Sequence, residues 1–289
     1  MDLSIIILNY NTKDLTTDCL NSILSQYKNE LEKSRFEIIL VDNASTDGSV
    51  EAFKKLNIEN LELIESRENL GFSKGCNMGA SSASGDYLLF LNSDTEIKDQ
   101  GFIKMVEHFE KNTDVGILGG ALKNEDGTSQ SSAGKFYNLS NLFLMMLGFE
   151  RLGFLRESPK TIEEVDWVSG ACLMIKRKVF KIIGGFEKEL FMYGEDWELC
   201  FRANQNGFKT YFYPEIMLFH KERGSSNRGF AILNIYKSIL FFYKKYKPGW
   251  QYKIAGFILH SKSFILNTVG LLTGNKYLVE TYGKTLELF

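Results

Sequence analysis

Residues 3–11 read LSIIILNYN and residues 36–47 read FEIILVDNASTD, and in each an apolar run ends in polar residues. An apolar run of this kind is typical of a strand buried on both faces of a sheet. Residues 12–27, between the two runs, place their apolar side chains on one face of a helix: Leu15, Cys19, Leu20, Ile23 and Leu24. A strand, a helix and a second strand in this order predict a parallel pair joined by a right-handed crossover.

The same alternation continues to residue 120. We expect further strands at 61–65, 87–91 and 115–118, and helices at 50–55, 74–84 and 101–111. These elements predict an α/β fold with a Rossmann-like, mostly parallel sheet flanked by helices. Ligands of such sheets bind beyond the carboxyl ends of the strands. Three polar clusters, 9–11, 42–47 and 92–94, follow three of the predicted strands, so the sequence predicts a ligand site at this edge.

Beyond residue 120 the alternation fades. We expect a strand at 167–175 crossed by Gly170, helices at 178–183 and 195–206, short strands at 210–213 and 216–220, and aromatic, basic helices from residue 229. This pattern predicts a catalytic domain over 1–228, with a nucleotide-binding half (1–120) and an acceptor half (121–228), and a C-terminal helical region (229–289).

The composition is that of a soluble globular chain of 289 residues, with 44% hydrophobic and 24% charged residues. It excludes a disordered chain, a collagen-like chain and a polytopic membrane protein. The net charge of −2 provides no basic field for nucleic acid, so an anionic ligand needs a local site. Four cysteines without a CxxC pair, and an N-terminus without a basic leader, lead us to expect reduced thiols in a cytoplasmic protein.

Asp42 follows a buried strand and is a candidate for base recognition. Its carboxylate can accept the imide N–H of uracil or thymine, while Tyr10 stacks on the ring; the alternative is a simple Asx turn. The segment 69–75, NLGFSKG, opens a helix with glycines whose N–H groups could meet phosphate or ribose. This segment is neither a P-loop nor a dinucleotide fingerprint.

Asp94, in the run Asn92-Ser93-Asp94, stands where a carboxylate can bind a divalent cation that bridges a diphosphate; the alternative is a helix cap or turn. His220, followed by Lys221 and Arg223, could cap the same diphosphate and cation or could be a structural histidine. Glu195 and Asp196 begin a helix, where they either complement its dipole or supply a general base.

Six ordered motifs carry a resemblance to a known family: IIILNYN (5–11), VDNASTDGS (41–49), ENLGFSKGCNMGA (68–80), GDYLLFLNSD (85–94), VSGACLMIKR (168–177) and GGFEKELFMYGEDWELCFR (184–202). Over residues 3–228 the chain resembles the family 2 inverting glycosyltransferases. Among them it most resembles bacterial rhamnosyltransferase-like members that build surface polysaccharides. The resemblance implies the GT-A fold, a nucleotide-binding half fused to an acceptor half.

The resemblance also implies roles for individual residues. Asp196 corresponds to the general base, with Glu195 orienting it or contacting the acceptor, and Asp94 and His220 correspond to ligands of Mn²⁺ or Mg²⁺. Asn92 replaces the first acid of the DxD metal motif, so it contributes no charge. Candidate contacts to the acceptor or the donor sugar are Trp167, Gly170 and Ala171. Candidate nucleotide-binding residues are Asn9, Tyr10, Asn11, Asp42, Asn69, Gly71, Lys74, Asn77, Asn92 and Ser93.

We therefore expect a metal-dependent inverting glycosyltransferase that moves a sugar, with rhamnose a candidate, from a dTDP- or UDP-sugar. The expected acceptor is a glycan or a polyprenyl-diphosphate-linked saccharide used in surface polysaccharide synthesis. One alternative is a non-catalytic protein that binds nucleotide sugars or glycans. The other is a sugar-1-phosphate nucleotidyltransferase, which needs a Gly-rich basic loop after the first strand, where this chain has Asn9-Tyr10-Asn11.

The C-terminal region leaves two interpretations open. A helical apolar stripe, followed by lysines, comprises Ile232, Ile235, Tyr236, Ile239, Leu240 and Tyr243. Residues 254–272 are apolar but carry His260, Lys262 and Asn267, which argues against a membrane-spanning helix. The helices either pack on the catalytic domain or on a second subunit of a homodimer, or they lie at the inner face of the membrane near a polyprenyl-linked acceptor.

Overall fold

The computed structural model describes residues 1–149, 155–221 and 227–289. A central sheet crosses the molecule, and β7 (Ser129–Gln130) and β5 (Thr95–Ile97) pair with two of its strands. The main strands lie in the order β10 (Glu163–Glu164), β13 (Lys209–His220), β6 (Val115–Lys123), β12 (Cys172–Lys176), β4 (Tyr87–Asn92), β1 (Leu3–Asn9), β2 (Phe36–Asp42) and β3 (Leu61–Glu65). A small second sheet has the order β11 (Trp167–Val168), β8 (Ala133–Gly134), β9 (Arg156–Glu157).

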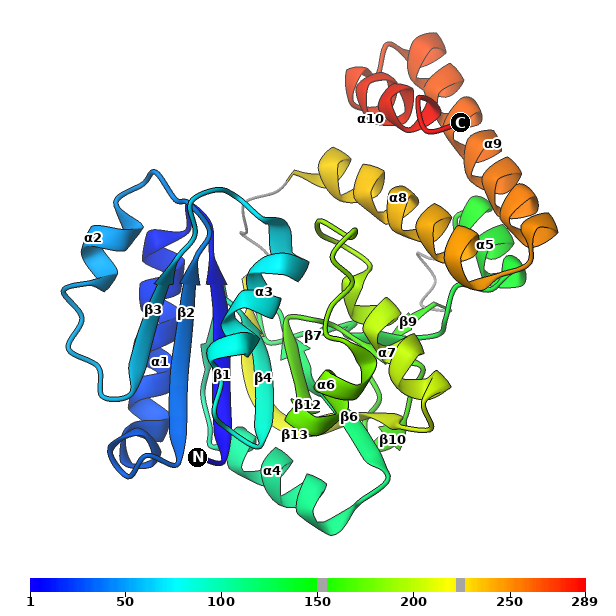
Figure 1. The fold of residues 1–289 in the computed structure, drawn as a ribbon. Coiled ribbons are helices and arrows are strands. Elements are labelled where there is room, and N and C mark those ends of the chain that lie inside the picture. Colours follow the sequence, from blue (N-terminus) through cyan, green and yellow to red (C-terminus); the bar gives the residue numbers. More distant parts are fainter. Residues whose placement is uncertain (150–154, 222–226) are drawn as a thin grey trace.

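Helices cover both faces of the central sheet (Figure 1). In chain order they are α1 (Lys13–Glu32), α2 (Ser49–Phe53), α3 (Gly71–Ser82), α4 (Gly101–Lys111), α5 (Leu139–Met146), α6 (Arg177–Ile183), α7 (Glu195–Gln205), α8 (Arg228–Tyr246), α9 (Gly249–Thr273) and α10 (Lys276–Leu286). Residues of α1 and α4 form one apolar core with the sheet, and residues of α3, α6, α7, α8 and α9 belong to the core on the other face.

The two cores explain the unbroken apolar runs of the inner strands. In β1, Ile5 and Ile7 belong to the core beneath α1, while Ile6 belongs to the core beneath α3. Because successive side chains of a strand point to opposite faces, a strand covered on both sides needs an apolar residue at every position. Strands β1, β2, β3 and β4 pair in parallel, as the alternating pattern predicts.

Two glycines let α3 pack closely on β1. A Cβ atom at Gly75 would lie 2.5 Å from a methyl carbon of Leu8, and one at Gly79 would lie 2.7 Å from a methyl carbon of Ile6. A larger residue at either position would have to displace these side chains or move the helix away from the sheet. The close packing holds the start of α3 next to the carboxyl end of β1, where ligands of such sheets bind.

The second half of the chain differs from its predicted strands in three places. The strand expected at 167–175 is two strands of different sheets, β11 and β12, because the chain turns at Ser169–Ala171 around Gly170. The two short strands expected at 210–213 and 216–220 form one irregular strand, β13, whose register shifts around Pro214. In addition, β12 lies antiparallel between β4 and β6, so the sheet is mixed although its first strands are parallel.

The C-terminal helices begin as part of the catalytic core. Phe242 of α8 packs edge-on against Trp197 and Phe201 of α7, with ring centroids 4.9 and 4.8 Å apart. The domain boundary at residue 228 stays a prediction, since the helix that follows it shares this core. Farther along, α9 is the one helix of the described residues that is long and apolar enough to cross a membrane, by length and composition alone.

Candidate active site

Asn9 and Asp42 stand at the ends of β1 and β2 and are joined to each other. The Asn9 Nδ2 donates to Asp42 Oδ2 at 2.7 Å and to Ser45 Oγ at 2.9 Å, and its Oδ1 accepts from the hydroxyls of Thr12 and Thr16. The Asn9 side chain is therefore fully used inside the protein and holds the carboxylate of Asp42. Asp42 also accepts from the Ser45 N–H at 2.9 Å, so the turn weighed as the alternative role is present. A carboxylate has further lone pairs, so this turn leaves acceptor capacity for a ligand.

Asn11 clamps the loop after β1 to the loop after β2. Its φ is +53°, its Oδ1 accepts from the Thr46 N–H at 2.7 Å, and its own N–H donates to Ser45 Oγ at 3.0 Å. Tyr10, half-buried, lies between Asn9 and Asn11. The clamp fixes the edge on which a base would rest.

The segment 69–77 is tied to its surroundings by amide side chains. Asn43, which sequence reasoning left unassigned, donates to Asn69 Oδ1 at 2.9 Å and accepts from the Leu70 N–H. Asn77 exchanges two hydrogen bonds of 2.8 Å with the backbone of Phe186 and so holds the segment that leads to α7. These contacts favour a structural role for Asn77.

Gly71 and Lys74 of the same segment differ in exposure. Gly71 has φ +75°, and a Cβ atom there would lie 2.5 Å from the Phe191 carbonyl oxygen, so only glycine allows this approach. Lys74 is exposed and is available to an anionic ligand.

Asn92, Asp94 and His220 come together at the end of β4. The pairing of β5 with β13 sets His220 opposite Thr95, and the His220 Nε2 lies 3.2 Å from Asp94 Oδ1 and 3.3 Å from Asn92 Nδ2. Ser93 points elsewhere, with its Oγ 3.2 Å from Thr12 Oγ1. Arg223, proposed to assist His220, lies outside the described residues.

Gln130 orients the His220 ring and was not found from the sequence, because a single glutamine in a loop carries no motif. Its Oε1 lies 2.7 Å from His220 Nδ1, while its Nε2 donates to Asn124 Oδ1 at 3.1 Å. With the amide set in this way, Gln130 Oε1 can accept a proton from His220 Nδ1, which would leave His220 Nε2 available to a cation held beside Asp94. A hydrogen bond of this kind on the outer nitrogen is typical of histidines that bind metal ions.

This arrangement fits a Mg²⁺ or Mn²⁺ ion that also binds substrate phosphates. Such ions are commonly held by one or two carboxylates while phosphates and water fill the remaining positions. Among the described residues, no three or more His, Cys, Asp or Glu side chains are placed so that they could hold a metal ion together, so Asp94 and His220 would hold the ion only together with a substrate.

A cleft of about 180 Å³ adjoins this pair. It is smaller than the ~300–1,000 Å³ common for ligand pockets, so it suits one part of a substrate. Seven residues singled out from the sequence line it: Asn92, Trp167, Gly170, Ala171, Glu195, Asp196 and His220. The candidates at the ends of β1 and β2 are not part of its lining, and neither are Asn69, Gly71, Lys74, Asn77, Ser93 and Asp94. The cleft also exposes residues the sequence did not suggest, including Phe72, Tyr137, Arg156 and Tyr193.

Glu195 and Asp196 begin α7 after a turn in which Tyr193 and Gly194 have φ of +67° and +110°. Asp196 Oδ1 accepts from the Trp197 N–H at 2.8 Å and Oδ2 from the Gly170 N–H at 3.2 Å. Glu195 is 6% exposed, and its Oε2 has no hydrogen-bond partner among the described residues.

The surroundings of these two acids separate their protonation states. Burial raises the pKa of both carboxyls, and the adjacent Asp196 raises that of Glu195 further. The N–H groups of Trp197 and Gly170 and the charge of Arg156 oppose this rise at Asp196. These contacts favour the charged form at Asp196 over that at Glu195, so Asp196 is the better placed of the two to accept a proton in the cleft.

Helix α8 holds the first turns of α7, through Ser238 and Tyr246. At the start of α7, Ser238 Oγ donates to the Tyr193 carbonyl at 2.5 Å, and a Cβ atom at Gly194 would lie 2.5 Å from Ser238 Cβ. Farther along, Arg202 donates to both oxygens of the fully buried Glu198 at 2.8 and 2.7 Å.

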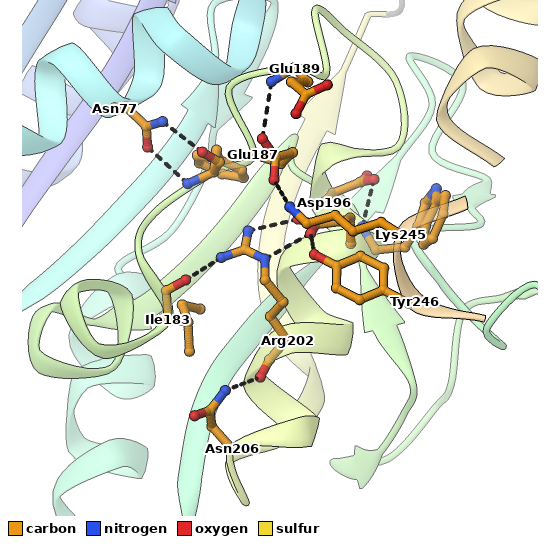
Figure 2. A network of polar contacts seen from close by, with 12 residues as sticks. Asn77, Ile183, Glu187, Glu189, Asp196, Arg202, Asn206, Lys245 and Tyr246 are labelled. Carbon is orange, nitrogen blue, oxygen red and sulfur yellow. Dashed lines mark hydrogen bonds and ion pairs between the residues drawn. The ribbon is translucent and has the colours of Figure 1, made fainter. Parts of the chain in front are cut away.

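The same network continues into α8 and α6. The Tyr246 hydroxyl of α8 donates to Glu198 at 2.5 Å, Lys245 pairs with Glu187, and Arg202 also donates to the Ile183 carbonyl. In Figure 2 the labelled side chains of Arg202, Lys245 and Tyr246 point toward one another.

The family model for Glycosyl transferase family 2 matches residues 4–184, which is more than half of the chain. The chain belongs to this family. The family 2 chain is 25% identical over 234 residues to the N-acetylglucosaminyl-diphospho-decaprenol L-rhamnosyltransferase of Mycobacterium tuberculosis, covering 74% of the chain and 76% of that protein. It is 28% identical over 233 residues to the O-antigen biosynthesis protein RfbC of Myxococcus xanthus, covering 77% of the chain but 17% of that protein.

A solved structure shares the fold. The mannosyltransferase PcManGT from Pyrobaculum calidifontis, in complex with GDP-Man and Mn²⁺, superposes with a TM-score of 0.61. The two chains are 16% identical, and the match covers 98% of this chain and 86% of that one. The resemblance inferred from six motifs and the GT-A fold are thus confirmed, and this family 2 chain is a glycosyltransferase with relatives in glycan synthesis.

Proposed function

We propose that this glycosyltransferase is metal-dependent and inverting. It transfers a sugar, with rhamnose the first candidate, from a dTDP- or UDP-sugar to a saccharide or polyprenyl-linked acceptor in the cytoplasm. The relative named as a rhamnosyltransferase acting on a diphospho-decaprenol supports the sugar and the acceptor. A structural neighbour that holds a nucleotide sugar and Mn²⁺ supports the donor class and the cation.

The observation that carries the proposal is the pair of acids that opens α7 in the cleft: Asp196 accepts from the N–H groups of Trp197 and Gly170, and the adjacent Glu195 is buried. Inversion needs one displacement: the acceptor oxygen bonds to the anomeric carbon while the bond from that carbon to the nucleoside diphosphate breaks. Asp196 takes the proton of the acceptor hydroxyl, and the bonding electrons leave with the diphosphate. A single ionised carboxylate suffices for this step. Glu195, held neutral, can donate a hydrogen bond to a substrate oxygen.

The leaving group needs its developing charge offset. Asp94 and His220, the latter oriented by Gln130, would hold a divalent cation, which supplies Lewis-acid stabilisation of a diphosphate when bound. Asp42 and Tyr10 remain our candidates for the base, with Asn69, Gly71 and Lys74 for ribose or phosphate. Trp167, Gly170 and Ala171, with Arg156 beside Trp167, form the wall proposed for the acceptor or the donor sugar.

A donor panel tests this proposal. Purified protein is incubated with Mn²⁺ and dTDP-, UDP- or GDP-sugars, and release of the nucleoside diphosphate is measured. We expect release from a dTDP- or UDP-sugar. Asp196→Asn, which keeps shape and hydrogen bonding, should lower turnover roughly 10²–10⁴-fold with donor affinity within a few-fold. Donor binding without release by the wild type would favour the non-catalytic alternative, and full activity of Asp196→Asn would move the base elsewhere.

A further inference from the structure

Helix α9 exposes an apolar stripe along its length. Its exposed side chains include Phe257 and Phe264, which are 71% and 58% exposed. The stripe runs through positions three or four residues apart, so its members share one face: Trp250, Ile254, Phe257, Ser261, Phe264, Thr268 and Leu271, with Ile265 and Leu272 beside them. It covers about a third of the circumference of the helix, and within α9 the charged residue on this face, Lys253, lies near its start.

The opposite face of α9 is already buried. Ala255, Leu259, Ser263 and Gly270 are covered by the protein, and a Cβ atom at Gly270 would lie 2.8 Å from Leu278 of α10. Lys262 donates to the Met145 carbonyl of α5, which fixes α5 beside α9. The helix cannot turn its apolar stripe inward, so this face meets whatever surrounds the protein.

The charge of the same region is opposite to that of the rest of the chain. Residues 229–289 contain eight lysines and two glutamates, a net charge of +6, and because the whole chain carries −2, residues 1–228 carry −8. Exposed lysines lie at both ends of the stripe, Lys244 and Lys253 near its start and Lys276 beyond its end. Aromatic residues mark the same two ends: Trp250 and Tyr277.

We propose that the α9 stripe is a membrane-docking surface that lies in the interface of a bilayer containing anionic lipids. Apolar side chains on one face, lysines at the flanks and Trp or Tyr at the ends are what an interfacial helix needs, and anionic headgroups attract a local positive charge. A second copy of the chain fits less well, since a two-fold interface would bring the same lysines of both copies together.

The way the helix is packed favours lying on the membrane over crossing it. Helix α10 packs against α9 and carries exposed charged residues, including Lys276 and Glu280, which a spanning α9 would draw into the hydrocarbon region. Figure 1 shows α8 leading from the side of α7 to α9, with α10 beyond α9. Since α8 also holds α7, docking would anchor the element that carries Asp196 near the membrane.

Tryptophan fluorescence gives a direct test on the full chain. Of the three tryptophans, Trp167 and Trp197 are 3% and 4% exposed, while Trp250 is 58% exposed, so a lipid-induced change reports on Trp250. With vesicles of phosphatidylcholine and phosphatidylglycerol we expect a blue shift and quenching by lipids brominated near the headgroup. Quenching that is strongest with bromine at the bilayer centre would indicate a spanning helix and overturn the proposal. Trp250→Phe, which should lose the signal and keep vesicle binding, identifies its source.

Matched charge insertions test the stripe itself. Phe257→Glu/Phe264→Glu should lower the vesicle partition coefficient at least tenfold, while Ile182→Glu, at a 61% exposed site on α6, should leave it within two-fold. Circular dichroism checks that all three proteins are folded. Binding should weaken several-fold on raising salt to about 0.5 M and be weak on pure phosphatidylcholine.

Besides quenching at the bilayer centre, three results would overturn the proposal: no vesicle binding by the wild type, equal loss in Ile182→Glu, or a stable dimer in solution that the double variant dissociates. Vesicle binding is measured without donor or acceptor. A failure here therefore leaves the proposed transferase activity standing, and an inactive protein that binds vesicles leaves the docking surface standing.

Discussion

Removing Arg202 should destabilise the fold through the buried carboxylate it leaves behind. In Arg202→Met the helix-forming propensity and approximate length of the side chain are kept, but both hydrogen bonds to Glu198 are lost. The Glu198 side chain is fully buried and that of Arg202 is 15% exposed, so solvent screens this pair little. Breaking a buried pair by removing one partner costs about 3–5 kcal/mol.

That free energy converts into a measurable melting shift. An unfolding entropy of about 2.1 cal/mol/K per residue amounts to roughly 0.6 kcal/mol/K for 289 residues. Dividing the lost free energy of unfolding by this entropy predicts a fall in Tm of about 5–8 °C. Differential scanning calorimetry or fluorimetry in the absence of ligands measures the shift.

Two companion variants separate the buried charge from lost packing. Tyr246→Phe removes one hydrogen bond to the same carboxylate and should lower Tm by less than Arg202→Met. The double variant Arg202→Met/Glu198→Gln no longer buries an unpaired charge and should recover part of the loss. A Tm for Arg202→Met within 1 °C or so of wild type, or a double variant less stable than the single one, would refute the reasoning.

Three further predictions concern the site. Burial raises the pKa of Glu195 in the folded state, so the native protein binds more protons than the unfolded chain and its stability should fall as pH rises above about 5. The Tm measured against pH should decline less in Glu195→Gln, and identical slopes would contradict the assignment of the raised pKa to Glu195. With Mn²⁺ present, UDP or dTDP at about 100 times the Kd of the nucleotide should stabilise the protein by about 2.7 kcal/mol, a rise in Tm of roughly 4 °C, whereas ADP should not. Equal stabilisation by ADP would remove Asp42 from base recognition. Asp94→Ala should abolish the metal dependence of this nucleotide-induced shift, as EDTA should in the wild type, and a shift that survives EDTA would leave Asp94 and His220 without their proposed role.

Features set by local pattern could be predicted from the sequence. The runs around Ile5–Ile7 and Ile38–Val41 are apolar at every position because their strands are buried on both faces, and β1, β2 and β4 lie where expected. Six ordered motifs sufficed for the family, and the strand-end clusters sufficed to point to one edge of the sheet.

Contacts between distant segments had no local signal, so only the tertiary structure decided them. β12 lies antiparallel between β4 and β6, and the alternation of strands and helices along the chain does not encode which strands become neighbours. Gln130 orients His220 across 90 residues of sequence, and α8 holds α7 through Ser238 and Tyr246. The preference for the charged form at Asp196 over that at Glu195 likewise depends on which acid receives the Gly170 N–H and the charge of Arg156. Hydrophobic periodicity reports the burial of an element, whereas hydrogen bonds and charge act over a few ångströms, and only folding brings their partners within that range.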